Sequence, residues 1–264
     1  MDKSLINKDL QQYVIFPDSD GTVDINLSAG EERTFIISGA IYKSSDIKVN
    51  VNVGRNSGLT LYHVVSAEEK SSASFKIHQD ADSRVRFFTA MLGNGDAINN
   101  IDAHLDAPNA DFRLDGIVIP EGAATGAYNV AVNHHLPHCT SNQDFKYLLR
   151  GTSRGLFNGL IRVDHDAHHT EAFQSNRNIL VGEHARMETL PQLEIYCDEV
   201  KCSHGSATGE LDQQALFYMR SRGIGLDEAR SMLMNAFLSD IIDRIELTPL
   251  RDEIRNRVQS SLAQ

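Results

Sequence analysis

The sequence predicts a mainly β protein: a solenoid of stacked coils, followed by a small C-terminal α-helical domain. Up to about Glu210, short β-rich segments follow one another with little helical periodicity, and polar links rich in Gly, Asn, Asp and Ser separate them. After Thr208 the hydrophobic period changes from two to about 3.6 residues. We therefore expect residues 1–208 to form the β domain and residues 209–264 to form the helical domain.

Alternation of apolar and polar residues defines the predicted strands. Within 48–53, three valines point to one side while Lys48, Asn50 and Asn52 point to the other, as in a strand with one solvated face. The predicted strand ranges are 13–16, 23–27, 34–37, 47–53, 59–65, 75–78, 85–90, 112–119, 128–132 and 145–149. Their links are too short for helical crossovers, which leaves a sandwich, a barrel or a solenoid.

A weak repeat favours the solenoid. Apolar segments at 160–164, 178–182 and 193–198 recur every 15 to 18 residues. Stacked coils of a β-helix would produce such a recurrence, because each coil buries the apolar row of the next. The Asn-Gly and Asp-Gly pairs that favour tight hairpins are scarce between these strands, which is a modest argument against an antiparallel meander.

Three amphipathic helices are predicted after the β domain. The first ends before Gly223, which suits the position after a helix C-terminus, and the second covers about 226–245. The third opens with Thr248 and Pro249, an N-cap residue followed by a proline. The expected apolar stripes are Leu211, Ala215, Tyr218 and Met219; Leu226, Ala229, Leu233, Phe237, Ile241 and Ile245; and Leu250, Ile254, Val258 and Leu262. Met232, Met234 and Leu238 are expected either to face a partner or to belong to the local core.

Composition narrows the possible functions. The 25 basic and 36 acidic residues give a net charge of −11, which disfavours binding to nucleic acid or to anionic lipid. Three cysteines are an odd number, which argues against a disulfide framework and suits a reducing compartment. Without an apolar leader or a long apolar run, we expect a cytoplasmic protein.

Common catalytic motifs are absent or out of context. Residues 151–155 match the G-x-S-x-G nucleophile elbow around Ser153, but the following residues predict a turn and a strand where the elbow needs a helix. We therefore expect a turn between coils. No phosphate-binding loop and no dinucleotide-binding motif occur, so any ATP would be handled by a partner.

Histidines and cysteines crowd into the second half of the chain. Cys197, Cys202 and His204 fall within eight residues, and Cys202 and His204 would share one face of a strand. They are candidate ligands for a soft metal or a cluster iron, although such a site needs about four ligands. Buried thiols and a solvated imidazole are an equally weighted alternative. We expect the His165, His168 and His169 group to be a solvated loop.

The run 191–209, with Lys201-Cys202-Ser203-His204-Gly205 at its core, continues into the Leu216-Phe217-Tyr218 helix. Together with 153–159 and 174–180, it resembles the SufB/SufD family of iron-sulfur cluster assembly scaffolds, and its SufD branch most. The resemblance covers about residues 133–245; the first 74 residues show no diagnostic motif. The helical N-terminal region of long family members has no counterpart, and Cys197 stands where the family often has a small apolar residue.

The resemblance implies a right-handed parallel β-helix, a C-terminal helical domain and a non-catalytic role. It implies pairing with a SufB-like subunit or a second copy, and docking of a SufC-type ABC ATPase. His204, beside Cys202, would be a cluster or iron ligand at the interface. We expect any Fe-S cluster or iron to be transient and shared with a partner, and none to be held tightly by this chain alone. The expected ATPase-docking residues are Leu216, Phe217, Met219, Leu226, Leu233 and Phe237.

Two other functions remain open at this stage. A β-helix enzyme acting on polysaccharide would need acidic catalytic residues and aromatic platforms, and the lack of tryptophan counts against it. A purely structural homo-oligomer would bind no ATPase.

Overall fold

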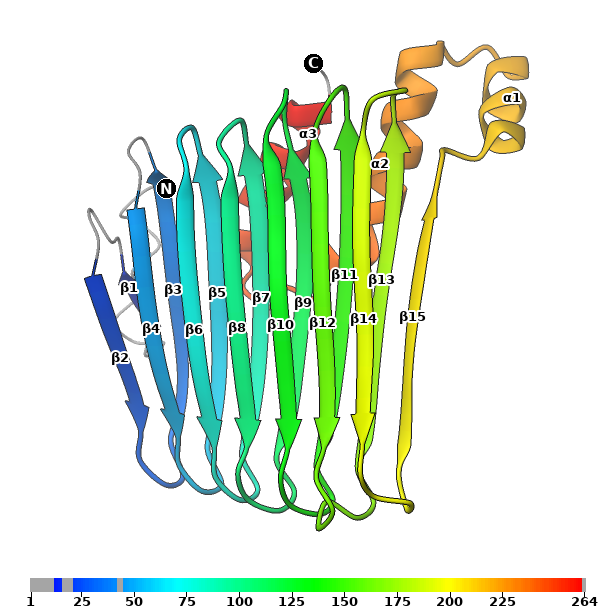
Figure 1. Cartoon of the computed structure of the whole chain (residues 1–264). Helices are drawn as coiled ribbons and strands as arrows, with labels where there is room; N and C mark the ends of the chain where they lie inside the picture. Colours follow the sequence, from blue (N-terminus) through cyan, green and yellow to red (C-terminus); the bar gives the residue numbers. More distant parts are fainter. Residues whose placement is uncertain (1–11, 16–20, 42–44, 263–264) are drawn as a thin grey trace.

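The chain folds as a β-solenoid with three C-terminal helices, which confirms the predicted fold class (Figure 1). The computed structural model describes residues 12–15, 21–41 and 45–262. Phe16, the predicted end of the first strand, lies outside the described residues. Successive strands alternate between two parallel sheets, so that each coil contributes one strand to each sheet.

The described residues form an eight-stranded sheet of odd-numbered strands and a seven-stranded sheet of even-numbered strands. The odd sheet contains β1 (Gln12–Ile15), β3 (Glu32–Ile41), β5 (Gly58–Ala67), β7 (Arg84–Gly93), β9 (Asp111–Pro120), β11 (Thr140–Arg150), β13 (Glu171–Val181) and β15 (Lys201–Gly209). The even sheet contains β2 (Gly21–Leu27), β4 (Ser45–Val53), β6 (Ser71–Gln79), β8 (Ala97–Leu105), β10 (Thr125–His134), β12 (Arg154–Val163) and β14 (Arg186–Ile195).

Residues one coil apart lie opposite each other in the parallel register. On the exposed face of the even sheet, the Asn50 side chain donates a 2.8 Å hydrogen bond to Asp24, which is 26 residues earlier in the sequence. Asn129 likewise donates a 2.9 Å hydrogen bond to Asn100, which is 29 residues earlier. The predicted coil length of 15 to 18 residues is therefore wrong. That spacing separates successive strands, which lie in different sheets, because the apolar pattern repeats once per strand and not once per coil.

The interior between the sheets is the main hydrophobic core, and the alternation expected for 48–53 is confirmed. Val49, Val51 and Val53 are buried, while Lys48, Asn50 and Asn52 are exposed. Strand β8 was not predicted: three of its five buried positions hold the small or polar residues Ala97, Asn99 and Ala103, which weakens the apolar signal.

Three helices follow the solenoid: α1 (Gln213–Ser221), α2 (Leu226–Ile242) and α3 (Thr248–Leu262). Asp212 caps α1 by accepting from two backbone amides, and Gly223 takes the predicted position after the helix with φ of 89°. Helix α2 ends three residues before the predicted Ile245. None of the helices in the described part of the chain is long and apolar enough to cross a membrane.

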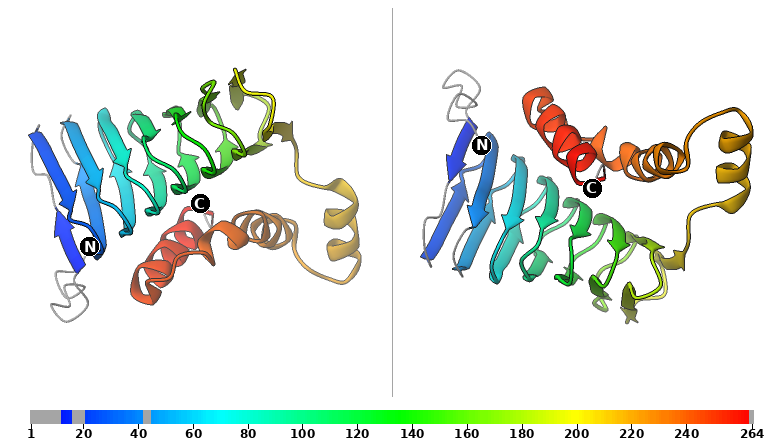
Figure 2. Two further views of the ribbon diagram at one scale, coloured as in Figure 1. Left: turned by 90° about the horizontal axis from the view of Figure 1, so that it is seen from below. Right: turned by 90° about the horizontal axis from the view of Figure 1, so that it is seen from above.

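Helices α2 and α3 cover the outer face of the odd sheet (Figure 2). Apolar residues of β3, β5, β7, β9 and β11 pack with the helices in a second core, to which Met234 and Leu238 contribute fully buried side chains. Of the three apolar residues that sequence reasoning left open, only Met232 stays exposed. The four residues of the predicted α3 stripe are all buried.

An ionic network also attaches α2 to the odd sheet. The Arg244 guanidinium contacts Asp115 at 2.7 Å and Asp144 at 3.0 Å, and both carboxylates are less than a tenth exposed. Arg177 also contacts Asp144, and buried Lys146 pairs with Asp240 of α2. The helical segment is therefore attached by ion pairs as well as by apolar packing.

We predict that Arg244→Met destabilises the protein by about 1.5–3 kcal/mol, because it removes one of two arginine partners from each of two buried carboxylates, which keep Arg113 and Arg177. Urea unfolding measures this change. The control is Arg255→Met, whose partners Asp243 and Asp252 are more than half exposed and whose loss costs about 1 kcal/mol or less. Equal effects of the two substitutions would contradict the role of the network.

A buried histidine gives the stability a pH dependence. Burial lowers the pKa of His63 to about 3, and its Nδ1 atom lies 3.3 Å from the Thr89 hydroxyl. Unfolded chains take up this proton near pH 6.5. Between about pH 6.5 and 3 the unfolded state therefore binds more protons, and the free energy of unfolding decreases as the pH falls through that window.

We predict that His63→Leu reduces this loss of stability by up to about 1.4 kcal/mol per pH unit. The Thr89 hydroxyl keeps Tyr128 as a partner in the variant. Urea unfolding of both proteins between pH 7 and 4.5 measures the slopes. His134, whose pKa burial also lowers to about 3, still titrates in both proteins, so some slope should remain. Identical pH dependence in the two proteins would refute the assignment to His63.

Candidate functional site

Strand β15 is the last strand of the odd sheet and carries two of the predicted ligand residues. It pairs with β13 on one side, with Cys202 opposite Ala172 and His204 opposite Gln174. Its other edge pairs with no strand in the described part of the chain. Cys202 is half-buried and His204 is exposed.

Both side chains continue columns that face the interior of the solenoid. His204 follows Leu114, Gln143 and Gln174 in successive coils, and those three residues are buried. In the same way, Cys202 follows Phe112, Ser141 and Ala172. In the described part of the chain no further coil covers the coil of β14 and β15, so its interior-facing residues are open to a partner or to solvent.

The interior becomes polar toward this open end. Gln174 Nε2 donates a 2.8 Å hydrogen bond to Gln143 Oε1. The other amide atoms of this pair, Gln143 Nε2 and Gln174 Oε1, are buried and have no hydrogen-bond partner. Gly159 of β12 faces this pair, and a Cβ atom there would lie 2.3 Å from the Gln174 amide nitrogen. The glycine thus makes room for a polar column that leads to His204.

Cys197 lies apart from His204, in the loop between β14 and β15. It is buried, and its Sγ atom is 3.3 Å from Nδ1 of His168. It packs in a small cluster to which Cys202 also contributes. Within the described residues, Cys197, Cys202 and His204 do not converge closely enough to hold one metal ion.

The thiols of Cys202 and Cys139 are not activated by their surroundings. Burial raises the pKa of the Cys202 thiol, and the neighbouring Cys197 also raises it, so the neutral thiol is favoured at pH 7. Burial likewise raises the pKa of Cys139. Ligand binding by Cys202 would therefore require deprotonation driven by the incoming metal.

The other predicted motif residues lie in turns. Ser153 is fully buried, its Oγ atom accepts from the Arg150 amide at 3.0 Å, and β12 begins at Arg154, so the expected turn is confirmed. His165, His168 and His169 are exposed; His169 lies 3.7 Å from Glu199.

Sequence reasoning missed one histidine group. His78, His104 and His135 come from three successive coils, with ring centroids 4.8 and 5.5 Å apart. Their separations of 26 and 31 residues correspond to one coil each. The spacing of these histidines could have been recognised in the sequence only if the coil length had been known.

The predicted docking residues divide into exposed and packed side chains. Phe217 is 76 % exposed, and its neighbour Tyr218 is also well exposed; Leu226 and Met232 are partly so. In contrast, Leu216 is buried, and Met219, Leu233 and Phe237 pack against the second core.

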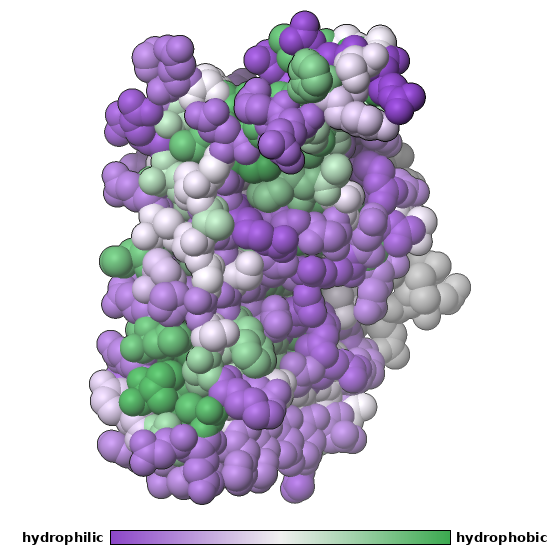
Figure 3. All heavy atoms as spheres, turned by 90° about the vertical axis from the view of Figure 1, so that its right-hand side faces the viewer, coloured by the Kyte–Doolittle hydropathy of each residue, from purple (hydrophilic) through white to green (hydrophobic). Residues whose placement is uncertain are grey.

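Helix α1 projects beyond the end of the solenoid (Figures 1 and 2). Figure 3 looks onto this end and shows a mostly hydrophilic face with separate hydrophobic patches.

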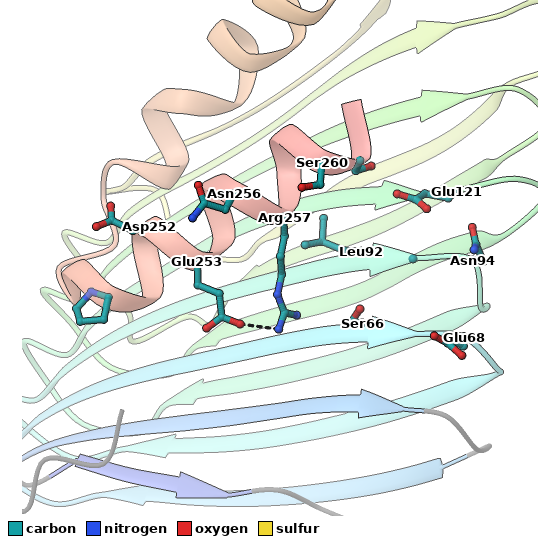
Figure 4. Close-up of a pocket in the computed structure, with 13 residues that line it drawn as sticks. Ser66, Glu68, Leu92, Asn94, Glu121, Asp252, Glu253, Asn256, Arg257 and Ser260 are labelled. Carbon is teal, nitrogen blue, oxygen red and sulfur yellow. Dashed lines mark hydrogen bonds and ion pairs between the residues drawn. The ribbon is translucent and has the colours of Figure 1, made fainter. Parts of the chain in front are cut away.

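A groove of about 670 Å³ lies between α3 and the ends of the odd strands (Figure 4). Its lining includes Glu68, Glu121, Asp252 and Glu253, with Arg257 paired to Glu253. No histidine or cysteine lines it.

Comparison with known proteins agrees with this geometry. Residues 22–237 match the family model described as SUF system FeS cluster assembly, SufBD core domain. The chain is 29 % identical to the iron-sulfur cluster assembly protein SufD of Escherichia coli K12, over 90 % of this chain and 58 % of that protein. A SufBD family protein of Synechocystis is 30 % identical over 81 % of this chain and 48 % of its own length.

The chain thus spans about half to three fifths of the length of these relatives. The family model, in contrast, covers most of this chain, including the solenoid from β2 onward and the first two helices up to Phe237. The chain belongs to the SufBD core family of SUF iron-sulfur cluster assembly proteins, and it is close to SufD.

Proposed function

We propose that this chain is a non-catalytic, SufD-like scaffold subunit of the cytoplasmic SUF machinery. It docks a SufC-type ABC ATPase through its C-terminal helices and builds a cluster interface with a SufB-like subunit or a second copy. The observation that supports this most is the placement of Cys202 and His204 at the open end of the solenoid.

Completion by a second chain follows from the chemistry of that end. An iron-sulfur cluster is held by about four protein ligands. Cys202 and His204 supply two on one strand face, and Cys197 is turned toward His168. Ligands from a facing chain would complete the set, so the cluster would be transient and shared.

The unpaired edges of β14 and β15 favour a β-solenoid as that second chain. In the described structure each is the last strand of its sheet, and each presents one edge with free backbone groups. Leu190 of β14 is 58 % exposed, and Ile195 at the end of the strand and Tyr196 directly after it are also exposed. Backbone pairing together with burial of this apolar area would hold the two scaffolds together.

The ATPase surface is assigned to the projecting helix α1. Phe217 and Tyr218 are large, exposed and adjacent, and large aromatic side chains dominate the energy of many interfaces. Leu226 and Met232 of α2 extend the apolar area. Leu216, Leu233 and Phe237 would act indirectly, because their side chains pack against the core and hold the helices in position.

We predict that His204→Ala leaves the fold intact and reduces cluster assembly several-fold. The side chain is exposed, so the free energy of unfolding should change by no more than about 0.5 kcal/mol. Visible absorbance of the cluster per reconstituted complex is the readout. The matched control is His184→Ala, another exposed histidine, in the loop between β13 and β14. Cluster yield equal to that of the unmodified complex would exclude the ligand role.

We also predict that the double substitution Phe217→Ala and Tyr218→Ala weakens binding of the ATPase at least tenfold, or about 1.4 kcal/mol. Calorimetric titration with the SufC-type ATPase measures the affinity. Leu190→Ala removes a comparably exposed side chain from the opposite surface and should leave the affinity unchanged. Equal affinities of the double variant and the unmodified chain would show that α1 is not the docking surface. Failure of the unmodified chain to bind any ATPase would favour a purely structural oligomer.

A further inference from the structure

A second group of metal-ligating side chains lies away from β15, at the turn end of the even sheet. His78 and His104 lie opposite each other on β6 and β8, and His135 directly follows β10. The planes of neighbouring rings in this row are within 10° of parallel. Asp106, in the turn after β8, lies among them.

Three ligand atoms converge in this row. His104 Nδ1 and His135 Nε2 are 3.2 Å apart, and Asp106 Oδ1 is 3.9 Å from His135 Nε2. His104, Asp106 and His135 each offer an atom within 4.8 Å of the other two, a condition that no other group of histidine, cysteine and carboxylate residues meets in the described part of the chain. Ligand atoms around a tetrahedral zinc ion lie about 3.3 Å apart, given Zn–N bonds of about 2.0–2.1 Å.

A carboxylate and a histidine outside the trio orient two of the three ligands. Asp164 Oδ2 lies 2.7 Å from His135 Nδ1, so that nitrogen donates and Nε2 keeps its lone pair for an ion. His78 Nδ1 lies 2.6 Å from Asp106 Oδ2. Asp102 Oδ2 lies 3.0 Å from His104 Nε2 but without the geometry of a hydrogen bond, so this buried nitrogen has no hydrogen-bond partner. Pairing of the second ring nitrogen with a carboxylate is typical of histidines that bind metal.

We propose that His104, His135 and Asp106 bind one divalent transition-metal ion of the Zn²⁺, Fe²⁺ or Co²⁺ class. The ion would sit between His104 Nδ1, His135 Nε2 and the Asp106 carboxylate, and the two rings would turn so that both nitrogen lone pairs point at it. Two imidazoles and one carboxylate suit such ions better than Ca²⁺ or Mg²⁺, which prefer oxygen ligands.

The site is accessible and is separate from Cys202 and His204. The side chains of His104, His135 and Asp106 are 21, 33 and 43 % exposed, so an ion can enter from solvent. The ligands come from the coils of β8 and β10, whereas Cys202 and His204 lie on β15. The proposal does not depend on the proposed scaffold function.

Titration of the purified, untagged chain with Co²⁺ tests the proposal. We expect one equivalent to produce visible d–d absorption without the near-ultraviolet sulfur-to-cobalt charge transfer that cysteine ligands would add. Absence of binding would mean that the row is a purely structural ladder and would overturn the proposal.

Substitutions separate this site from the cysteine group. His104→Asn with His135→Asn should abolish the absorption, while Cys202→Ser with His204→Asn should leave it unchanged. Retention in the first variant, or loss in the second, would refute the assignment. Asp164→Asn keeps all three ligands and should weaken binding about 10- to 100-fold, which guards against misfolding of the double variant. Circular dichroism and thermal unfolding show whether each variant folds.

Discussion

The parallel register between coils is the constraint on which the rest of this structure depends. Each residue lies opposite the residue one coil earlier, so side chains form columns along the solenoid. A column of apolar residues becomes core, as at Phe112 and Leu114. A column on the outer face becomes an amide ladder, as at Asn26 and Asn52. The candidate site and the histidine row are columns of the same kind, with different residues in them.

The same constraint explains why the interior becomes polar at one end. Up to β11 the interior is closed by coils on both sides, and large apolar side chains such as Phe145 fill most of it. In the next coil, Gln174, Asn176 and Asn178 of β13 lie opposite Gln143, Phe145 and Tyr147 of β11. The terminal strand β15 then presents Cys202 and His204 with no coil to cover them. An end that cannot complete its own core suits an interface at which a second chain supplies the missing half.

Local patterns in the sequence predicted most of the fold. Alternating valines marked β4, and Thr248 with Pro249 marked the start of α3 within one residue. The coil length could not be read, because turns of different length make the spacing vary from 26 to at least 29 residues. Without that length, the relation between His78, His104 and His135 stayed hidden.

Tertiary contacts decided what the sequence left open. The apolar residues of α2 are too many for one stripe, and only docking on the odd sheet determines that Met234 and Leu238 are core while Met232 is exposed. The same holds for Cys197: its closeness in sequence to Cys202 and His204 suggested a shared site, but the loop after β14 directs its Sγ atom to His168. Cys202 and His204, two residues apart on one strand, do share a face.

The central claim is that the open end formed by β14 and β15 is the surface on which a second scaffold chain completes the cluster site. Hydrogen–deuterium exchange of the chain, alone and mixed with a SufB-like subunit, tests it most directly. The account predicts that amides of Arg186–Ile195 and Lys201–Gly209 become protected on mixing, while strands in the middle of the solenoid do not change. Protection confined to other surfaces, or a complex that leaves β14 and β15 unchanged, would contradict it.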